Sequence, residues 1–121
     1  MNENKLILVV DDDQDFRHAT ELLLQANGYR VVTAMDAEEA LEKARAETPD
    51  LILLDVIMEE VDAGLVFAEK FGQTYPIVLI SSIADSAVRV FDAHKLPVRG
   101  ILQKPVKPEA LLEKVRAVLQ A

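Results

Sequence analysis

The segment LILVVDDD, residues 6–13, joins five consecutive apolar residues to three acids. An apolar run without alternation is typical of a strand that is covered on both faces, as in parallel sheets flanked by helices. The three carboxylates then fall at the carboxyl end of that strand, which is where open α/β sheets bind their ligands. The segment therefore predicts both a parallel sheet and a polar site at its edge.

Four further apolar runs, at residues 29–34, 51–54, 77–80 and 100–102, alternate with segments of helical periodicity. This alternation indicates repeated βα units and predicts a doubly wound (βα)5, flavodoxin-like three-layer sandwich. The second run is not followed by polar residues comparable to those after the others. We therefore expect its strand at an edge, which corresponds to the parallel order 2-1-3-4-5.

Local signals mark the helix ends. Asp36 and Glu39 resemble a capping box, Asn27-Gly28 and Phe71-Gly72 resemble C-terminal stops, and Pro108 suits a first helical turn. The third and fourth helices, expected at 65–71 and 86–93, have the least regular apolar stripes. Helical periodicity predicts these inward-facing residues on the other helices: Phe16, Ala19, Leu23, Ala26, Ala40, Leu41, Ala44, Leu111, Leu112, Val115 and Leu119.

Composition narrows the class of protein. The 121 residues suit a single domain spanning 1–121, and the absence of cysteine excludes disulfides, a thiolate zinc site and a cysteine nucleophile. We expect a cytoplasmic protein without a targeting segment, because the run at 6–10 is too short for a membrane span. The net charge of -8 disfavours direct binding of nucleic acid or of anionic membranes.

Polar residues follow four of the five runs, namely Asp11-Asp12-Asp13, Asp55, Ser81-Ser82 and Lys104. The carboxyl ends of parallel strands meet at one sheet edge, so these residues are expected to converge there. Crowded carboxylates with only oxygen donors favour Mg²⁺. Phosphoryl transfer needs such a metal, an in-line nucleophile and groups that neutralise the phosphoryl charge. We predict Asp55 as nucleophile, Lys104 as cation, and the Ser81 hydroxyl with the Ser82 N–H as oxygen donors.

The segments LILVVDDD, LILLDV, PIVLISS and ILQKPV together resemble the four characteristic segments of response-regulator receiver domains, the chemotaxis-regulator-like modules of two-component signalling. The resemblance extends over essentially the whole chain. It implies a Mg²⁺ site in which Asp11 binds through water, Asp12 directly, and Asp55 and the Ile57 carbonyl complete the protein ligands. It also implies a cis peptide bond between Lys104 and Pro105.

The same resemblance implies a signalling cycle. A sensor histidine kinase or a phosphotransfer protein donates to Asp55, and the phosphorylated domain rearranges helix 86–93 and strand 100–102 to change how it binds a downstream protein. A homodimer is expected through these two elements and the last helix. The domain is thus not expected to be an enzyme with an external substrate, but a phosphoacceptor that assists its own phosphorylation and dephosphorylation.

The chain departs from the family pattern at several positions. Glu59 replaces a proline four residues after the phosphoacceptor, and Ile101 replaces an aromatic ring that swings inward on activation. Ile57 and Ile83 are apolar where polar side chains would hold an attacking water. We therefore predict slow self-dephosphorylation, which loss of the label within seconds in Mg²⁺ buffer without a phosphatase would contradict.

Two other functions compete with this interpretation. Asp11-Asp12-Asp13 after an apolar strand also fits the Asp-x-Asp motif of haloacid-dehalogenase-type aspartyl phosphatases, although Asp55 would then have no role. Ile101 and the altered loop also fit a receiver-like scaffold that no longer switches. Some of the predicted site residues also have an alternative role. The acids at 11–13 would complement the dipole of a helix N-terminus. Ser82 would exchange roles with Ser81 if the strand register were shifted by one.

Overall fold

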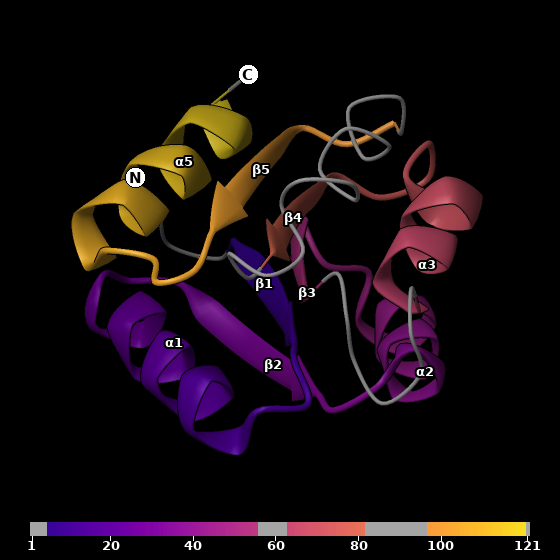
Figure 1. Ribbon diagram of the computed structural model, residues 1–121, viewed down its shortest axis with the longest axis horizontal. Coiled ribbons are helices and arrows are strands. Elements are labelled where there is room, and N and C mark those ends of the chain that lie inside the picture. Colours follow the sequence, from indigo (N-terminus) through magenta and orange to yellow (C-terminus); the bar gives the residue numbers. More distant parts are fainter. Residues whose placement is uncertain (1–4, 56–62, 82–96, 121) are drawn as a thin grey trace.

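The computed structural model describes residues 5–55, 63–81 and 97–120. Within these ranges the strands form one parallel sheet of order β2-β1-β3-β4-β5, which confirms the predicted topology (Figure 1). The strands are β1 Leu6–Val10, β2 Arg30–Ala34, β3 Leu51–Asp55, β4 Ile77–Ser81 and β5 Gly100–Gln103.

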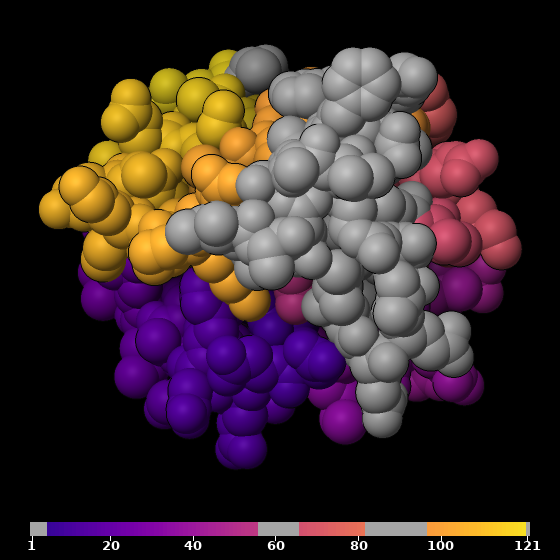
Figure 2. Space-filling view, viewed as in Figure 1, coloured from indigo at the N-terminus to yellow at the C-terminus, as the bar shows by residue number. Residues whose placement is uncertain are grey.

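Helices cover both faces of the sheet and complete the predicted three layers. They are α1 Gln14–Ala26, α2 Ala37–Glu47, α3 Ala63–Phe71 and α5 Pro108–Gln120. Helices α1 and α5 lie on one face, and α2 and α3 lie on the other (Figure 1). In the space-filling view, the indigo atoms of α1 and the yellow atoms of α5 lie on the left, and the pink atoms of α3 lie on the right (Figure 2). The helix expected at 86–93 lies outside the described residues. Among the described helices, none has the length and apolar character that crossing a membrane requires.

The expected capping groups are present. The Asp36 carboxylate accepts a hydrogen bond from the Glu39 backbone N–H at 2.8 Å, and the Glu39 side chain accepts one from the Met35 N–H at 2.7 Å. Helix α1 is followed by Asn27 as its C-cap and by Gly28, whose φ of 90° lies in the left-handed region. Glycine adopts this conformation at little cost, so the predicted stop is confirmed.

The core lies on both sides of the three central strands. Every residue of β1, β3 and β4 is buried, as the continuous apolar runs predicted. Successive side chains along β1 alternate between two clusters, because side chains of a strand point to opposite faces of the sheet. Leu8 packs in the cluster beneath α2 and α3, and Ile7 packs in the cluster beneath α1 and α5.

The inward face of α1 was predicted wrongly at two positions. Ala19 and Ala26 are exposed, whereas Thr20 and Leu24 are buried. Leucine occupies 22, 23 and 24, so the apolar pattern fits more than one rotation of the helix, and alanine adds little to the choice. The residues predicted for the other helices do lie in or against the core: Ala40, Leu41, Ala44, Leu111, Leu112, Val115 and Leu119.

A close contact joins the end of α3 to the segment before β5. A Cβ atom on Gly72 would lie 2.7 Å from the Ala68 carbonyl oxygen and 2.8 Å from the Pro97 Cγ, and closer still to the Pro97 carbonyl oxygen. Two of these three atoms belong to the backbone, so they have little freedom to move away. Glycine at position 72 thus allows the two segments to approach each other.

Candidate functional site

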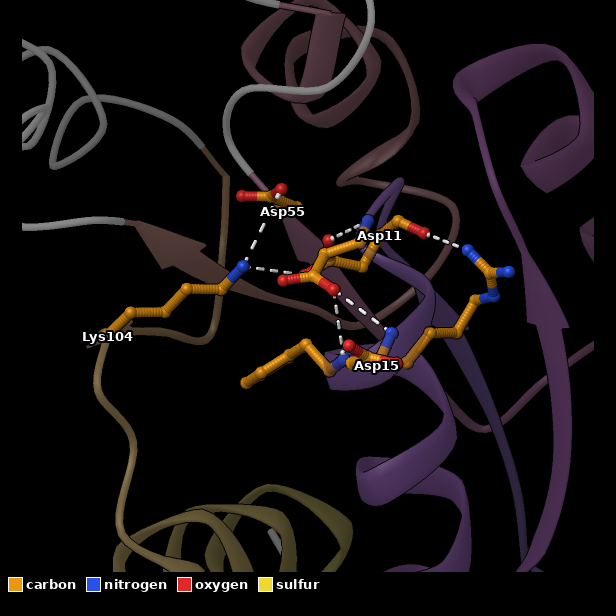
Figure 3. Close-up of polar contacts among 7 residues, drawn as sticks. Asp11, Asp15, Asp55 and Lys104 are labelled. Carbon is orange, nitrogen blue, oxygen red and sulfur yellow. Dashed lines mark hydrogen bonds and ion pairs between the residues drawn. The ribbon is translucent and has the colours of Figure 1, made fainter.

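Four predicted site residues converge at the carboxyl edge of the sheet. Asp11 directly follows β1, Asp55 ends β3, Ser81 ends β4, and Lys104 directly follows β5. Figure 3 shows the Lys104 side chain reaching toward both Asp11 and Asp55. Asp12, the residue after Asp11, is a fifth predicted residue at this edge, and the remaining two, Ser82 and Ile57, lie outside the described part of the chain. Residues from four strands therefore form one site, as the strand order requires.

Three carboxylates form a cluster at this edge. Asp11, Asp12 and Asp55 each offer an oxygen, and these oxygens all lie within 4.8 Å of one another. Asp11 and Asp55 are buried, with exposed fractions of 1% and 6%, whereas Asp12 faces solvent. A set of hard oxygen donors that is open to water on one side suits a divalent cation that keeps part of its hydration shell. The donors therefore fit Mg²⁺.

Lys104 supplies the positive charge of the site. Its Nζ lies 2.8 Å from Asp11 Oδ2 and 3.8 Å from Asp55 Oδ2. The Lys104 backbone N–H donates to the Ser81 carbonyl at 2.6 Å, and the peptide bond to Pro105 is cis, as predicted. The ends of β4 and β5 are thus fixed to each other, and this connection sets the point from which the lysine reaches the acids.

Burial and neighbouring charges perturb the acid-base chemistry. Burial, followed by the negative charges of Asp11 and Asp12, raises the pKa of Asp55 to about 7, although Lys104 opposes this shift. Burial lowers the pKa of Lys104, but its hydrogen bond to Asp11 and the charges of the surrounding acids outweigh that effect and leave the pKa raised. A cation bound among the carboxylates would favour the ionised form of Asp55.

The turn between β1 and α1 is held by its own hydrogen bonds. Asp11 Oδ1 accepts from the Asp13 N–H at 2.8 Å, and Arg17 Nη1 donates to the Asp11 carbonyl at 2.6 Å. Asp13 Oδ1 in turn accepts from the N–H groups of Asp15 and Phe16 at 3.0 and 3.3 Å. Asp13 is therefore the N-cap of α1, the structural role that was one alternative for the acids at 11–13.

Two contacts at the site were not predicted from the sequence. Lys104 Nζ lies over the ring of Phe16, 4.3 Å from its centroid, whereas the sequence assigned Phe16 to the core alone. Arg17, which had no predicted role, holds the carbonyl of Asp11. Both residues lie near the start of α1, the helix that follows β1 and the acids at 11–13. That position was the only signal in the sequence that would have pointed to them.

Ser81 is fully buried at the end of β4. Its hydroxyl oxygen has no hydrogen-bond partner among the residues that the structure describes. A buried hydroxyl without a partner costs about 1–3 kcal/mol, so such groups in native proteins call for an explanation. An oxygen-bearing ligand bound at this edge of the sheet would offer one, because the hydroxyl could donate to a ligand oxygen.

A parallel sheet of this order, with acids after β1 and β3 and a lysine after β5, defines the class of receiver domains. A family model described as the response regulator receiver domain matches residues 7–116. The chain therefore belongs to this family, whose members act in two-component signalling. This assignment gives no support to the phosphatase alternative.

Individual relatives agree with the assignment. The chain is 35% identical over 120 residues to the alkaline phosphatase synthesis transcriptional regulatory protein PhoP of Bacillus subtilis, covering 97% of this chain and 49% of PhoP. It is 37% identical over 117 residues to the probable transcriptional regulator ycf27 of Cyanophora paradoxa, covering 96% and 48%. The chain thus spans about half the length of these curated relatives.

Two solved structures share the fold over nearly the whole chain. The chemotaxis protein CheY4 of Vibrio cholerae superimposes with a TM-score of 0.83 at 32% identity, covering 94% of this chain and 98% of that chain. The receiver domain of NtrX from Brucella abortus gives a TM-score of 0.85 at 27% identity, covering 95% and 98%. In both cases the similarity covers nearly all of the solved chain.

Proposed function

We propose that Asp55 accepts a phosphoryl group in a Mg²⁺-dependent reaction and that the phosphorylated domain binds a partner protein differently. The observation that carries the proposal is the joint placement of Asp55, two further acids and Lys104 at one sheet edge. Lys104 Nζ lies within 3.8 Å of Asp55, and the three carboxylates lie close enough to share one cation. Phosphoryl transfer needs little more than this positioning and charge neutralisation.

The proposed transfer step is supported by this geometry. An Asp55 carboxylate oxygen attacks phosphorus and forms an acyl phosphate, while the bond between phosphorus and the donor breaks and the donor leaves with the electron pair. The ammonium of Lys104 and the hydroxyl of Ser81 stabilise charge on the phosphoryl oxygens. Ser82, which lies outside the described residues, is proposed to contribute its backbone N–H.

The metal ligands are proposed as Asp11, Asp12, Asp55 and the carbonyl of Ile57, the last outside the described residues. When bound, Mg²⁺ neutralises charge on the transferring oxygens. Asp11 then carries two functions, because its Oδ2 also accepts a hydrogen bond from Lys104. Its burial and the fixed turn around it hold the carboxylate in place for both.

The donor is proposed to be a sensor histidine kinase or a phosphotransfer protein, whose phosphohistidine supplies the phosphoryl group. A cytoplasmic location fits such a donor and the absence of cysteine. The names of PhoP and ycf27 describe transcriptional regulators, so a regulator of transcription is one whole-protein role that fits this domain. The net charge of -8 argues that the domain itself does not contact the nucleic acid.

A homodimer through the face of helix 86–93, β5 and α5 remains a proposal. In its described part, this face carries Arg99 and Lys114 beside Ala117 and Val118. A two-fold interface brings the same patch of both copies together. Arg99 and Lys114 would repel their own counterparts there, so in such a dimer they must face acids of the other copy. Sedimentation of the phosphorylated and unphosphorylated protein tests the dimer directly.

The central experiment is labelling with acetyl phosphate in Mg²⁺ buffer, followed by intact mass and peptide mapping. The wild type is expected to gain one phosphoryl group on Asp55, and Asp55→Asn is expected to gain none. Hydrolysis of a phosphomonoester that depends on Asp11 but not on Asp55 would contradict the proposal.

A second measurement tests switching. Beryllofluoride with Mg²⁺ mimics the phosphoryl group, so it should change the NMR spectrum or the oligomeric state of the wild type. If the wild type were labelled on Asp55 but showed neither change, the domain would be a phosphoacceptor without the proposed switch. Ile101, which is half-buried on β5, makes this measurement informative, because the family's inward-swinging ring is absent at that position.

A further inference from the structure

The ring of Phe16 lies directly against the functional lysine. Lys104 Nζ is 4.3 Å from the ring centroid, 2.8 Å from Asp11 Oδ2 and 3.8 Å from Asp55 Oδ2. We propose that Phe16 is a positioning residue, which holds the Lys104 ammonium beside Asp55 through the face of its ring. This role rests on the proposed function of Asp55, because it concerns the position of the cation that would serve the phosphorylation of Asp55.

The physical basis is the interaction of a cation with an aromatic face. The face of a phenyl ring is electronegative and attracts an ammonium within about 6 Å of its centroid, more strongly when the cation is partly desolvated. The Lys104 side chain is only 23% exposed, so water screens this contact incompletely. Without a fixed partner, a lysine on a flexible four-carbon stem would spread over many rotamers.

Phe16 is itself held from two sides. Its backbone N–H donates to the capping carboxylate of Asp13 at 3.3 Å, and its half-buried ring packs against the cluster beneath α1 and α5. Neither contact involves a group that the proposed reaction changes. The ring therefore offers a support that stays constant through the cycle.

That constancy distinguishes Phe16 from Asp11, the other close partner of Lys104. A divalent cation that binds Asp11 takes up part of the negative charge that attracts the lysine, and it also repels the ammonium. The uncharged ring keeps its attraction. Phe16 thus keeps Lys104 near Asp55 when the site is loaded, at the moment when the salt bridge to Asp11 is weakened.

The test compares Phe16→Leu, which keeps an apolar side chain without a ring, with Phe16→Trp, which keeps an aromatic face. Phosphorylation of Asp55 by acetyl phosphate is expected to be roughly fivefold slower in Phe16→Leu and largely restored in Phe16→Trp. Phe71→Leu is the matched control, because it removes a half-buried ring from the other face of the sheet. It should leave the rate within about twofold of wild type.

A readout that does not depend on phosphorylation tests the contact itself. In the metal-free protein, the ε-methylene protons of Lys104 should be shifted upfield by the ring current in wild type and Phe16→Trp, but not in Phe16→Leu. A wild-type rate for Phe16→Leu, or a rate for Phe16→Trp as low as that of Phe16→Leu, would overturn the inference. Absence of label on wild-type Asp55 would instead refute the proposed function, whatever the ring-current shifts show.

Discussion

Replacing Asp55 by asparagine should stabilise the metal-free protein at pH 8. Folding raises the pKa of Asp55 from 3.8 to about 7, so between these values the native state holds a proton that the unfolded state has lost. Stability therefore falls as the pH rises from about 4 and levels off above about 7. Three pKa units correspond to about 4 kcal/mol, and screening by water at the open side of the site reduces our expectation to about 2 kcal/mol.

Urea unfolding followed by circular dichroism, in a chelator at pH 5 and pH 8, measures this effect. The asparagine variant should be more stable than wild type by about 2 kcal/mol at pH 8, with a difference about 1 kcal/mol smaller at pH 5. Glu69→Gln, which removes an exposed carboxylate on α3, is the control for net charge and should follow the wild type. If Asp55→Asn lost as much stability between the two pH values as wild type, the assigned cost of the buried carboxylate would be wrong.

Three further perturbations test other parts of the structure by the same unfolding assay. Mg²⁺ at ten times its Kd should stabilise the wild type by about 1.4 kcal/mol, and Asp12→Asn should lose most of this gain; equal stabilisation of the variant would remove Asp12 from the metal site. Ser81→Ala should raise the stability of the resting protein by about 1 kcal/mol, because the hydroxyl is buried without a partner among the described residues and its removal relieves the desolvation cost. A loss of stability would show that the hydroxyl is already hydrogen bonded. Gly72→Ala should cost about 2 kcal/mol, because the new Cβ meets the backbone of Ala68 and Pro97, and a gain in stability would contradict that close approach.

The sheet could be predicted because its central strands are buried on both faces. Such strands must be apolar at every position, and this leaves the continuous runs that the sequence shows at 6–10, 51–54 and 77–80. The site then followed from topology alone, since the residue after each such run must lie at the carboxyl edge. Asp55 illustrates this rule: it is the last residue of β3, which pairs with β1 on one side and with β4 on the other.

Side-chain packing was harder to predict than topology. The rotation of α1 depends on how Leu22, Leu23 and Leu24 share the space against the sheet, and three adjacent leucines fit several rotations. The contact of Phe16 with Lys104 depends on the directions of two side chains far apart in the sequence. The raised pKa of Asp55 depends first on burial, which a residue pattern does not quantify.

The position of Asp55 within the sheet has a mechanical consequence. Strand β3 is hydrogen bonded along both edges, to β1 and to β4, whereas β5 pairs with β4 alone within the described sheet. Displacing β3 breaks two ladders, and displacing β5 breaks one. Amide hydrogens of β3 should accordingly exchange with solvent more slowly than those of β5. If phosphorylation of Asp55 triggers a rearrangement, as proposed, β5 can therefore move at a lower cost than β3, and β5 is the strand that carries Ile101 and leads directly to Lys104.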